Sequence, residues 1–524
     1  MKIAGLDIGT TGCKCTVFDT DGTYLNKAYK EYPKTRVASG HEIDASVLRE
    51  CVFEVISIMA KEYPDIAGLG VTSFGETFVL VDEEGNPLMN SMLYTDPRGH
   101  EECLELIDKL GEMNIAKITG LRPHEMYGLP KLMWVKNHRP EVFNRTKYVL
   151  QVVDFIVYSL SGVAQEDYSL ATRTLAFDLD ALDWNSQLLE AAGIDSSIYP
   201  KPVPSGTPAG KILPKMAEKT GLSEETVIVS ISQDQIAAAV GAGAFDAKTA
   251  VDGSGTVECM TLIYDEKPDP EELYKGYFVT VPYIIPGKYV TYAFMYTGGA
   301  LIKWCTDNLT GKSLAQDANA GDGAGDSIGG GIGEKKITAT CSVNELLESR
   351  YSEIMKAIGR DEKDPTGLMI LPHFAGAATP YMDTGSKGAI VGLTVDTDIS
   401  EIYMACLEGI CYEMCLLYNK IKDSGLKFDS FNATGGGAKS KAFMQMKADM
   451  LGVPFVALEQ TDSGTVGSAM MTGVAIGIYK DIFEAAEIMI KTADKYEPDI
   501  KRHEKFMEVF KRYEKLYDAV RPLV

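Results

Sequence analysis

GLDIGTTGCK, residues 5–14, is a short apolar run that meets Asp7, then a turn of Gly and Thr, then a second strand-like run. Hairpin turns that contain glycine are common, so by itself the stretch favours an ordinary β-hairpin. A turn of this kind can also direct backbone N–H groups at phosphate oxygens, with an aspartate beside it that holds Mg²⁺ through water. The choice between the two interpretations depends on the rest of the chain.

The bulk composition is that of a soluble globular protein, with 45% hydrophobic and 24% charged residues. A chain of 524 residues is too long for one core and indicates about two to four domains. No run approaches the ~20 apolar residues that cross a bilayer. Asp7 and the Gly and Thr residues after it stand where a signal peptide has its apolar core, so we expect no such peptide.

The charge and the cysteine pattern narrow the set of partners. A formal net charge of -23 argues against nucleic acid or an anionic membrane, because both bind basic patches. A small anionic ligand remains compatible, since backbone amides and a bound cation can supply local positive potential. The ten cysteines contain no CxxC pair and the six histidines no HExxH spacing. We therefore expect a reduced, cytoplasmic protein without a structural metal; a homodimer is kept as an alternative, because the sequence does not specify the oligomeric state.

The pattern of the opening returns in the middle of the chain. TAVDGSGTVECMTLI, residues 249–263, again predicts a strand with an aspartate, a glycine turn and a second strand. Two related α/β domains, residues 1–247 and 248–524, with a cleft between them, account for this repetition. The Gly- and Asp-rich segment 311–336 is predicted as a mobile surface loop, with a substrate lid as the alternative.

Three further elements could carry chemistry together with the first turn. DGSGT, residues 252–256, is an equivalent turn in the second half, and the triple glycine 435–437 follows a predicted strand and precedes a predicted helix. A side chain in the triple glycine would block a flat ring or a phosphate from approaching the backbone. Asp234, beside Gln235, stands at a strand exit before a helix. There it could cap the helix, or it could accept a proton from a hydroxyl that attacks phosphorus.

These elements, in this order, resemble the FGGY family of carbohydrate kinases, members of the actin-like, sugar kinase and Hsp70 ATPase superfamily. The resemblance covers essentially the whole chain. The matching stretches are GLDIGTTGCK, YGLPKLMWVKN (127–137), SQDQIAAAVGAGA (232–244), DGSGT, TGGALIKWCTDNL (297–309), KGAIVGLTVDTDISEIYMACLEG (387–409) and TGGGAKSKAFMQMKADMLGVP (434–454). Gly128 and Cys406 are unusual residues within two of them.

The resemblance implies an α/β fold of two ribonuclease H-like (actin-like ATPase) domains with a catalytic cleft between them. It implies transfer of the γ-phosphoryl group from MgATP to a hydroxyl of a sugar or polyol. Asp234 is then the base that deprotonates the attacking hydroxyl, and Asp7 organises Mg²⁺ with the ATP phosphates. The residues implied for binding ATP are Thr10, Thr11, Lys14, Gly255, Thr256, Gly299, Gly435, Gly436, Gly437 and Lys439.

The substrate segment is a mixture of patterns within the family. Gly75-Glu76-Thr77 keeps the Glu-Thr of the Gln-Arg-Glu-Thr found in glycerol kinases but lacks its arginine. Asp234-Gln235 also matches glycerol kinases, whereas TDPRG, residues 95–99, is nearer to the Asn-Asp-Gly-Arg of xylulose kinases. The residues expected to contact the substrate are Phe74, Glu76, Thr77, Asp96, Arg98, Tyr127, Asp234 and Gln235.

Several substrate classes stay open at this point. The main hypothesis is a ketopentose, as in xylulose kinases; the alternatives are glycerol or another polyol, and an aldonate whose carboxylate would meet Arg98. A catalytically silent sugar-binding regulator with the same fold is the alternative from another class. Loss of Asp7 or Asp234 would support that regulator, and both residues are present.

Overall fold

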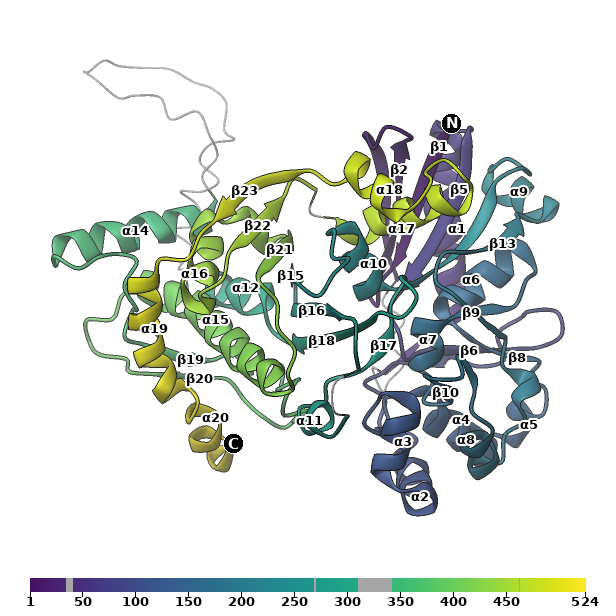
Figure 1. Ribbon diagram of the computed structural model, residues 1–524, viewed down its shortest axis with the longest axis horizontal. Helices are drawn as coiled ribbons and strands as arrows, with labels where there is room; N and C mark the ends of the chain where they lie inside the picture. Colours follow the sequence, from purple (N-terminus) through teal and green to yellow (C-terminus); the bar gives the residue numbers. More distant parts are fainter. Residues whose placement is uncertain (34–40, 268–269, 310–341, 461) are drawn as a thin grey trace.

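The computed structural model describes residues 1–524 except 34–40, 268–269, 310–341 and 461. The predicted loop or lid at 311–336 lies outside the described residues. Figure 1 shows two α/β halves side by side, the N-terminal half in purple to teal and the C-terminal half in teal, green and yellow. The predicted α/β class with two domains is therefore confirmed.

A mixed sheet lies at the centre of the N-terminal half. In the described part of the chain it has six strands, in the order β13-β14-β5-β1-β2-β3. The neighbours β1, β2 and β3 are antiparallel, whereas β5 runs parallel to both β1 and β14. The hairpin predicted at residues 5–14 is formed by β1 and β2. The strands are β1 (Lys2–Ile8), β2 (Gly12–Asp19), β3 (Tyr24–Glu31), β5 (Ile66–Ser73), β13 (Thr207–Lys211) and β14 (Val227–Gln233).

The sheet of the C-terminal half repeats this arrangement. Among the described residues it has seven strands, in the order β17-β18-β16-β15-β21-β22-β23. Here β15, β16 and β18 form the antiparallel part, and β15, β21 and β22 the parallel part. Their order matches that of β1, β2, β3, β5 and β14, as the repeated sequence pattern predicts. The strands are β15 (Thr249–Ser254), β16 (Glu258–Tyr264), β17 (Val281–Pro282), β18 (Tyr289–Met295), β21 (Ser430–Gly435), β22 (Phe455–Leu458) and β23 (Thr492–Tyr496).

Helices flank both sheets. In the N-terminal half they are α1 (Ala45–Glu62), α2 (His100–Leu110), α3 (Glu112–Thr119), α4 (Gly128–His138), α5 (Pro140–Phe143), α6 (Val152–Ser161), α7 (Tyr168–Thr172), α8 (Ser186–Ala192), α9 (Pro214–Thr220) and α10 (Asp234–Gly241). After them come α11 (Pro270–Lys275), α12 (Gly299–Leu309), α14 (Val343–Ala357), α15 (Ile399–Asp423), α16 (Lys441–Leu451), α17 (Ser463–Ala475), α18 (Ile482–Met489), α19 (Ile500–Tyr513) and α20 (Leu516–Val520).

Short elements complete the chain. The short strands are β4 (Glu42–Ile43), β6 (Phe78–Val81), β7 (Ser91–Met92), β8 (Tyr148–Gln151), β9 (Gln165–Asp167), β10 (Phe177–Asp178), β11 (Asp183–Trp184), β12 (Lys201–Val203), β19 (Met369–Leu371) and β20 (Ala389–Val391). The 3₁₀ turns are η1 (Ser196–Ile198), η2 (Gly437–Lys439) and η3 (Arg521–Leu523).

Helix α17 packs on the N-terminal sheet although its sequence follows the strands of the C-terminal sheet (Figure 1). The Ser468 hydroxyl donates to the Gly70 carbonyl of β5 at 2.9 Å. Glycines permit the contact between α17 and α10, because a Cβ on Gly467 would lie 1.9 Å from the Ala237 carbonyl oxygen. A Cβ on Gly241 would likewise lie 2.0 Å from the Ser463 carbonyl oxygen. These two helices therefore connect the halves through a backbone-to-backbone contact.

The core is built from both sheets and the helices that cover them. Helix α15 is largely buried in the C-terminal half, and its cysteines Cys406, Cys411 and Cys415 pack there as apolar side chains. All nine cysteines within the described ranges are buried and free, as predicted.

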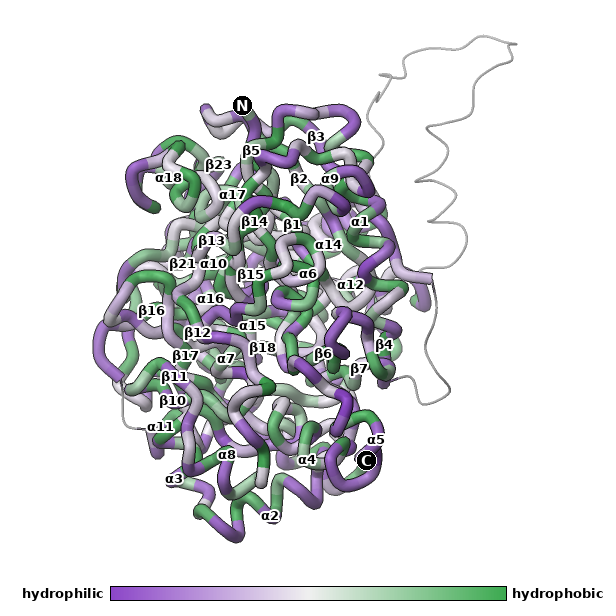
Figure 2. Tube along the Cα trace, turned by 90° about the vertical axis from the view of Figure 1, so that its right-hand side faces the viewer, coloured by the Kyte–Doolittle hydropathy of each residue, from purple (hydrophilic) through white to green (hydrophobic). Residues whose placement is uncertain are grey.

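Figure 2 shows hydrophilic stretches mainly at the periphery, for example at α2 and beside α18.

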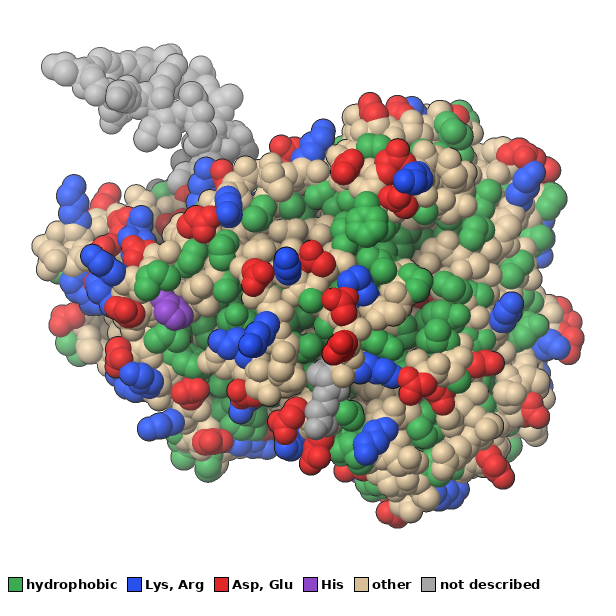
Figure 3. Space-filling model, viewed as in Figure 1, with side chains coloured by type: hydrophobic (Ala, Val, Ile, Leu, Met, Phe, Trp, Pro, Cys, Tyr) green, Lys and Arg blue, Asp and Glu red, His purple; other side chains and the backbone are tan. Residues whose placement is uncertain are grey.

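The surface carries both signs of charge. Figure 3 shows acidic and basic side chains interspersed over one face of the molecule. In the portion of the chain that the structure describes, no helix has the length and apolar character needed to span a bilayer.

Candidate active site

Three parallel strands of the N-terminal sheet place the predicted catalytic residues at one edge. Asp7 lies near the end of β1, beside Thr72 of β5, and Ser73 at the end of β5 pairs with Gln233 at the end of β14. The carboxyl ends of parallel strands meet at the same edge of a sheet. Asp7, the turn after β5 and Asp234 therefore converge, and both Asp7 and Glu76 act on the pKa of Asp234.

Asp234 is the first residue of α10, and Gln233 is its N-cap. The Gln233 side chain accepts a hydrogen bond from the Gln235 N–H at 3.2 Å, so the alternative that Asp234 is the N-cap is wrong. Both hydrogen bonds to the Asp234 carboxylate go to Oδ1, from Gln233 Nε2 at 2.6 Å and from the Gln235 N–H at 2.7 Å. Burial, with Asp7 and Glu76 nearby, raises the pKa of Asp234 to about 8. The ionised carboxylate is therefore a stronger base than an ordinary aspartate, and its Oδ2 receives no hydrogen bond from the described residues.

Asp7 lies in a charged cluster that spans both halves of the sequence. Lys14, its cross-strand neighbour on β2, lies with Nζ 3.1 Å from Asp7 Oδ2 and also forms an ion pair with Asp462. Burial raises the pKa of Asp7; Lys14 opposes that rise and Asp462 adds to it. The sequence pattern gave no indication of Asp462, which reaches the site because it immediately precedes α17.

The two predicted phosphate turns are tight and carry exposed threonines. In the first, the Gly9 N–H donates to the Gly12 carbonyl at 2.9 Å, and Thr10 and Thr11 are exposed at the tip. In the second, Thr256 is exposed, and the start of α12 is attached to the turn because the Gly299 N–H donates to the Gly255 carbonyl at 2.8 Å.

A cavity of about 300 Å³ opens beside the second turn. Four residues implied for ATP, Gly255, Gly299, Gly436 and Gly437, line it, whereas Thr256, Gly435 and Lys439 are adjacent but are not lining residues. The other lining residues are Ser254, Ile302, Lys303, Thr306, Asn344, Tyr403, Leu407, Ser440 and Phe443.

The three glycines at 435–437 are required for different reasons. Gly435 has φ +89°, and a Cβ there would lie 2.3 Å from the Ser254 carbonyl oxygen; a Cβ on Gly437 would lie 2.0 Å from Ser254 Oγ. A Cβ on Gly436 would meet no atom within 4 Å, so this residue borders open space. Gly435 and Gly437 thus allow the neighbouring strand to approach, and Gly436 allows a ligand to approach.

A buried ion cluster contacts the second phosphate turn, residues 252–256. Lys447 of α16 forms ion pairs with Asp252, at 2.6 Å, and with Glu258, and all three side chains are fully buried. Glu258 in turn accepts a hydrogen bond from the Ser254 hydroxyl at 3.0 Å. The cluster therefore connects α16 to the floor of the 300 Å³ cavity. The sequence gave no sign of this cluster, because Lys447 stands between Gln445 and Asp449 and does not differ there from a solvated lysine.

Among the residues predicted to contact the substrate, Glu76 forms a buried ion pair with Arg173. Glu76 has φ +62°, and the Arg173 guanidinium lies between the rings of Tyr127 and Tyr292, 5.1 and 5.3 Å from their centroids. Arg173 was not predicted, because 97 residues separate it from Glu76 and no motif joins them.

The other predicted substrate residues divide into two groups. Phe74 and Thr77 are buried next to Glu76, and Gln235 is half-buried beside Asp234. Asp96 instead pairs with Arg98, which also donates to Glu42 at 2.5 Å. Burial acts to raise the pKa of Asp96, but Arg98 holds it below its usual value.

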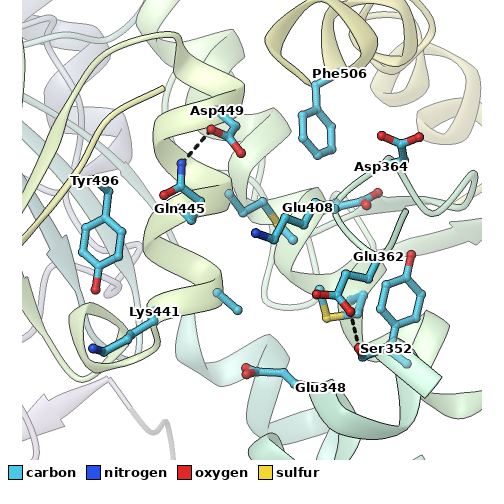
Figure 4. A pocket seen from close by; sticks show the side chains of 15 residues that line it. Glu348, Ser352, Glu362, Asp364, Glu408, Lys441, Gln445, Asp449, Tyr496 and Phe506 are labelled. Carbon is cyan, nitrogen blue, oxygen red and sulfur yellow. Dashed lines mark hydrogen bonds between the residues drawn. The ribbon is translucent and has the colours of Figure 1, made fainter. Parts of the chain in front are cut away.

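The largest cavity described here, about 410 Å³, lies elsewhere in the C-terminal half, and none of the predicted site residues lines it (Figure 4). Its wall carries Glu408, whose carboxylate accepts hydrogen bonds from the Thr366 N–H and hydroxyl at 2.8 and 2.9 Å. Gln445 and Asp449 face each other across one turn of α16, with a hydrogen bond of 2.8 Å (Figure 4).

Comparison with known proteins supports the resemblance. Residues 2–241 match the N-terminal domain, and residues 254–476 the C-terminal domain, of the FGGY family of carbohydrate kinases. A xylulose kinase of Bacillus subtilis is 26% identical over 99% of this chain and 97% of its own length. A glycerol kinase of Listeria welshimeri is 28% identical over 91% of each chain. The crystal structure of a ligand-bound xylulose kinase from Lactobacillus acidophilus has a TM-score of 0.83 at 23% identity, over 99% of this chain and 98% of that chain, which shows the shared fold.

Proposed function

Because this chain belongs to the FGGY family of carbohydrate kinases, we propose that it transfers the γ-phosphoryl group of ATP to a hydroxyl of a ketopentose, in a xylulokinase-like reaction. Xylulose kinases from Bacillus and Staphylococcus are similar to it over nearly their whole length. The observation that carries the proposal is the position of Asp234, which has a raised pKa and lies at the same sheet edge as Asp7 and Glu76.

Asp234 acts as the general base in this proposal. Its Oδ1 is held by Gln233 and Gln235, so Oδ2 is oriented by the start of α10 to take the proton of the attacking hydroxyl. The conjugate acid is stable near neutral pH because burial and the neighbouring carboxylates favour the protonated form.

The residues around Asp7 suit a magnesium ion. Asp7 and Asp462 share one lysine. Burial raises the pKa of Asp7 and the nearby Asp462 adds to that rise, so a bound cation would stabilise the ionised carboxylate. Mg²⁺ is usually held by one or two carboxylates together with phosphates and water, and Asp7 supplies one of these. When bound, the ion neutralises phosphate charge. Lys14 holds Asp7 in place from the neighbouring strand.

The remaining predicted residues would bind the nucleotide. Gly436 leaves the 300 Å³ cavity open to a flat ring. The backbone N–H groups of Thr10, Thr11 and Thr256, which are exposed at the two turns, would donate to phosphates. Positioning of the two substrates supplies much of the rate enhancement in phosphoryl transfer.

A polyol such as glycerol is the second candidate substrate. Glycerol kinases are among the similar proteins, and the Asp234-Gln235 and Glu76-Thr77 pairs match their pattern. An aldonate has less support, because Arg98 is already engaged by Asp96 and Glu42. A cytoplasmic location and a homodimer belong to the same proposal; the free, buried cysteines accord with a reducing compartment.

The experiment is a measurement of ADP release with a panel of pentuloses, hexuloses, polyols and aldonates. The proposal expects one ketopentose to give the highest kcat/KM, with the sugar phosphate identified by mass. Highest activity with glycerol would support the second candidate. No stimulation above the ATPase background by any compound would contradict both.

A further inference from the structure

We propose that Arg173 is a positioning residue that orients Glu76 to bind substrate hydroxyls, and that the pair selects uncharged sugars or polyols over aldonates. The inference rests on the proposed function and adds the substrate class of the same site.

Glu76 is fixed from two directions. Its backbone adopts the left-handed conformation, which is uncommon for a residue other than glycine, at the turn that follows β5. Arg173 contacts only Oε1 of the carboxylate, through Nε and Nη2. Among the described residues, no hydrogen-bond donor contacts Oε2. One oxygen is thus held and the other is available to a substrate hydroxyl.

Arg173 is itself held without using all of its donors. Its side chain is buried, with only 3% of its surface exposed, between the rings of Tyr127 and Tyr292. Its Nη1 is buried and has no hydrogen-bond partner in the structure, and neither has the Tyr292 hydroxyl. Leaving such groups unpaired is costly. A cavity of about 20 Å³, lined by Arg173, Tyr127 and Tyr292, has room for about one water molecule or hydroxyl group.

Gly75 lies next to the stem of the Arg173 side chain. A Cβ at Gly75 would lie 3.4 Å from Arg173 Cγ and 3.5 Å from Gln233 Cγ. The stem of Arg173 therefore passes over the backbone just before Glu76. The backbone of Arg173 is anchored to α4, because the Gly128 N–H donates to the Arg173 carbonyl at 3.4 Å. The arginine is thus supplied by a segment other than the one that carries Glu76.

The cations described near this edge already have partners, so a second anion would gain no new ion pair. Glu76 and Arg173 neutralise each other, and at the same edge Asp7 forms an ion pair with Lys14. Arg98 is engaged by Asp96 and Glu42. Arg122, which lines the same 20 Å³ cavity, pairs with Glu112, and Lys131 donates to the Glu125 carbonyl at 2.6 Å. Among the described residues these cations are therefore engaged, so an aldonate carboxylate would have to displace an existing partner, whereas hydroxyl groups can both donate to Glu76 and accept from Arg173.

The test compares R173Q and R173K with the wild type and with R139Q, a control at an exposed arginine on a surface ion pair. We measure kcat/KM for the best uncharged substrate and for gluconate, the KM for ATP, and the pH profile. R173Q should lower kcat/KM for the uncharged substrate by about 100-fold, as expected when a binding group is misplaced. The KM for ATP should stay within twofold. R173K keeps the positive charge but lacks the planar guanidinium group, so it should retain about a tenth of the activity that R173Q loses. R139Q should match the wild type.

The pH profile separates positioning from a merely structural role. The groups that act on Asp234 include Asp7, Glu76 and Lys14, and in R173Q the charge of Glu76 loses its partner. The acidic limb of kcat/KM should therefore move to higher pH in R173Q and return towards the wild-type position in the double variant E76Q/R173Q. The double variant has no uncompensated buried charge, so it keeps the test available if R173Q fails to fold.

Three results would overturn the inference: R173Q within threefold of the wild type, an unmoved pH limb, or a wild-type preference for gluconate. If the wild type phosphorylates a polyol but no ketopentose, the proposed function fails, and the inference stands when R173Q loses that polyol activity. If no compound is phosphorylated, both fail.

Discussion

Replacing Lys447 with methionine should destabilise the C-terminal half, because the change leaves Asp252 and Glu258 buried without their cation. All three side chains are fully buried, and Lys447 contacts both carboxylates. Removing one partner of a buried ion pair costs about 3–5 kcal/mol. For a unit of about 250 residues each kcal/mol lowers the melting temperature by about 2–4 °C, so we expect a decrease of about 10 °C.

The stability that K447M loses should increase with pH. Burial raises the pKa of Glu258, Lys447 lowers it, and Asp252 raises it further, so the variant has a still higher folded-state pKa. A carboxyl group whose pKa is higher in the folded state than in the unfolded state destabilises the fold at every pH above its unfolded-state pKa, which is about 4. The decrease in melting temperature caused by K447M should therefore be larger at pH 8 than at pH 5.

The assay is thermal unfolding followed by fluorescence, with K441M as the matched control. Lys441 lies on the same helix, is 79% exposed and pairs with Asp494 at 3.4 Å, an interaction worth about 0–1 kcal/mol. Because Glu258 holds Ser254 at the cavity floor, K447M should also raise the KM for ATP. A decrease of less than 2 °C, or an equal decrease in K441M, would refute this reasoning.

Three further changes have defined outcomes. E166Q should raise the melting temperature at pH 8 but not at pH 4. Burial and two neighbouring carboxylates raise the pKa of Glu166, and neither of its oxygens has a hydrogen-bond partner among the described residues. An unchanged melting temperature at pH 8 would contradict this. G436V should raise the KM for ATP with little loss of stability, because a side chain at Gly436 would extend into open space. G437A should lower the melting temperature, because its Cβ would collide with Ser254. The reverse pattern would contradict the assignment of Gly436 to the ligand and of Gly437 to packing. In the wild type, kcat/KM for ATP should fall as the pH decreases from 9 to 6, because Asp234 becomes protonated; a flat profile would reject it as the base.

The parts of the fold that could be predicted from sequence are those with local patterns. The apolar runs and glycine turns at 5–14 and 249–263 predict β1 with β2 and β15 with β16, and all four strands form. Asp234 lies at a strand exit as expected, because strand-to-helix junctions leave a clear change of hydrophobic period.

The parts that could not be predicted depend on contacts between distant single residues. Arg173 joins its cluster through one ion pair, and Asp462 and Lys447 join theirs through two each. A single charged residue leaves no periodic signal in the sequence. Helix α17 returns to the N-terminal sheet because glycines allow it to approach α10. In the sequence, these glycines do not differ from those that merely permit a turn.

The most direct measurement of the central claim is the rate of sugar-dependent ADP formation by D234N, with ATP binding measured on the same protein. Asn cannot accept the proton of the attacking hydroxyl but keeps nearly the same shape, so turnover should fall by about two to four orders of magnitude while the Kd for ATP stays within threefold. Turnover within tenfold of the wild type would contradict the assignment of Asp234 as the base of a carbohydrate kinase.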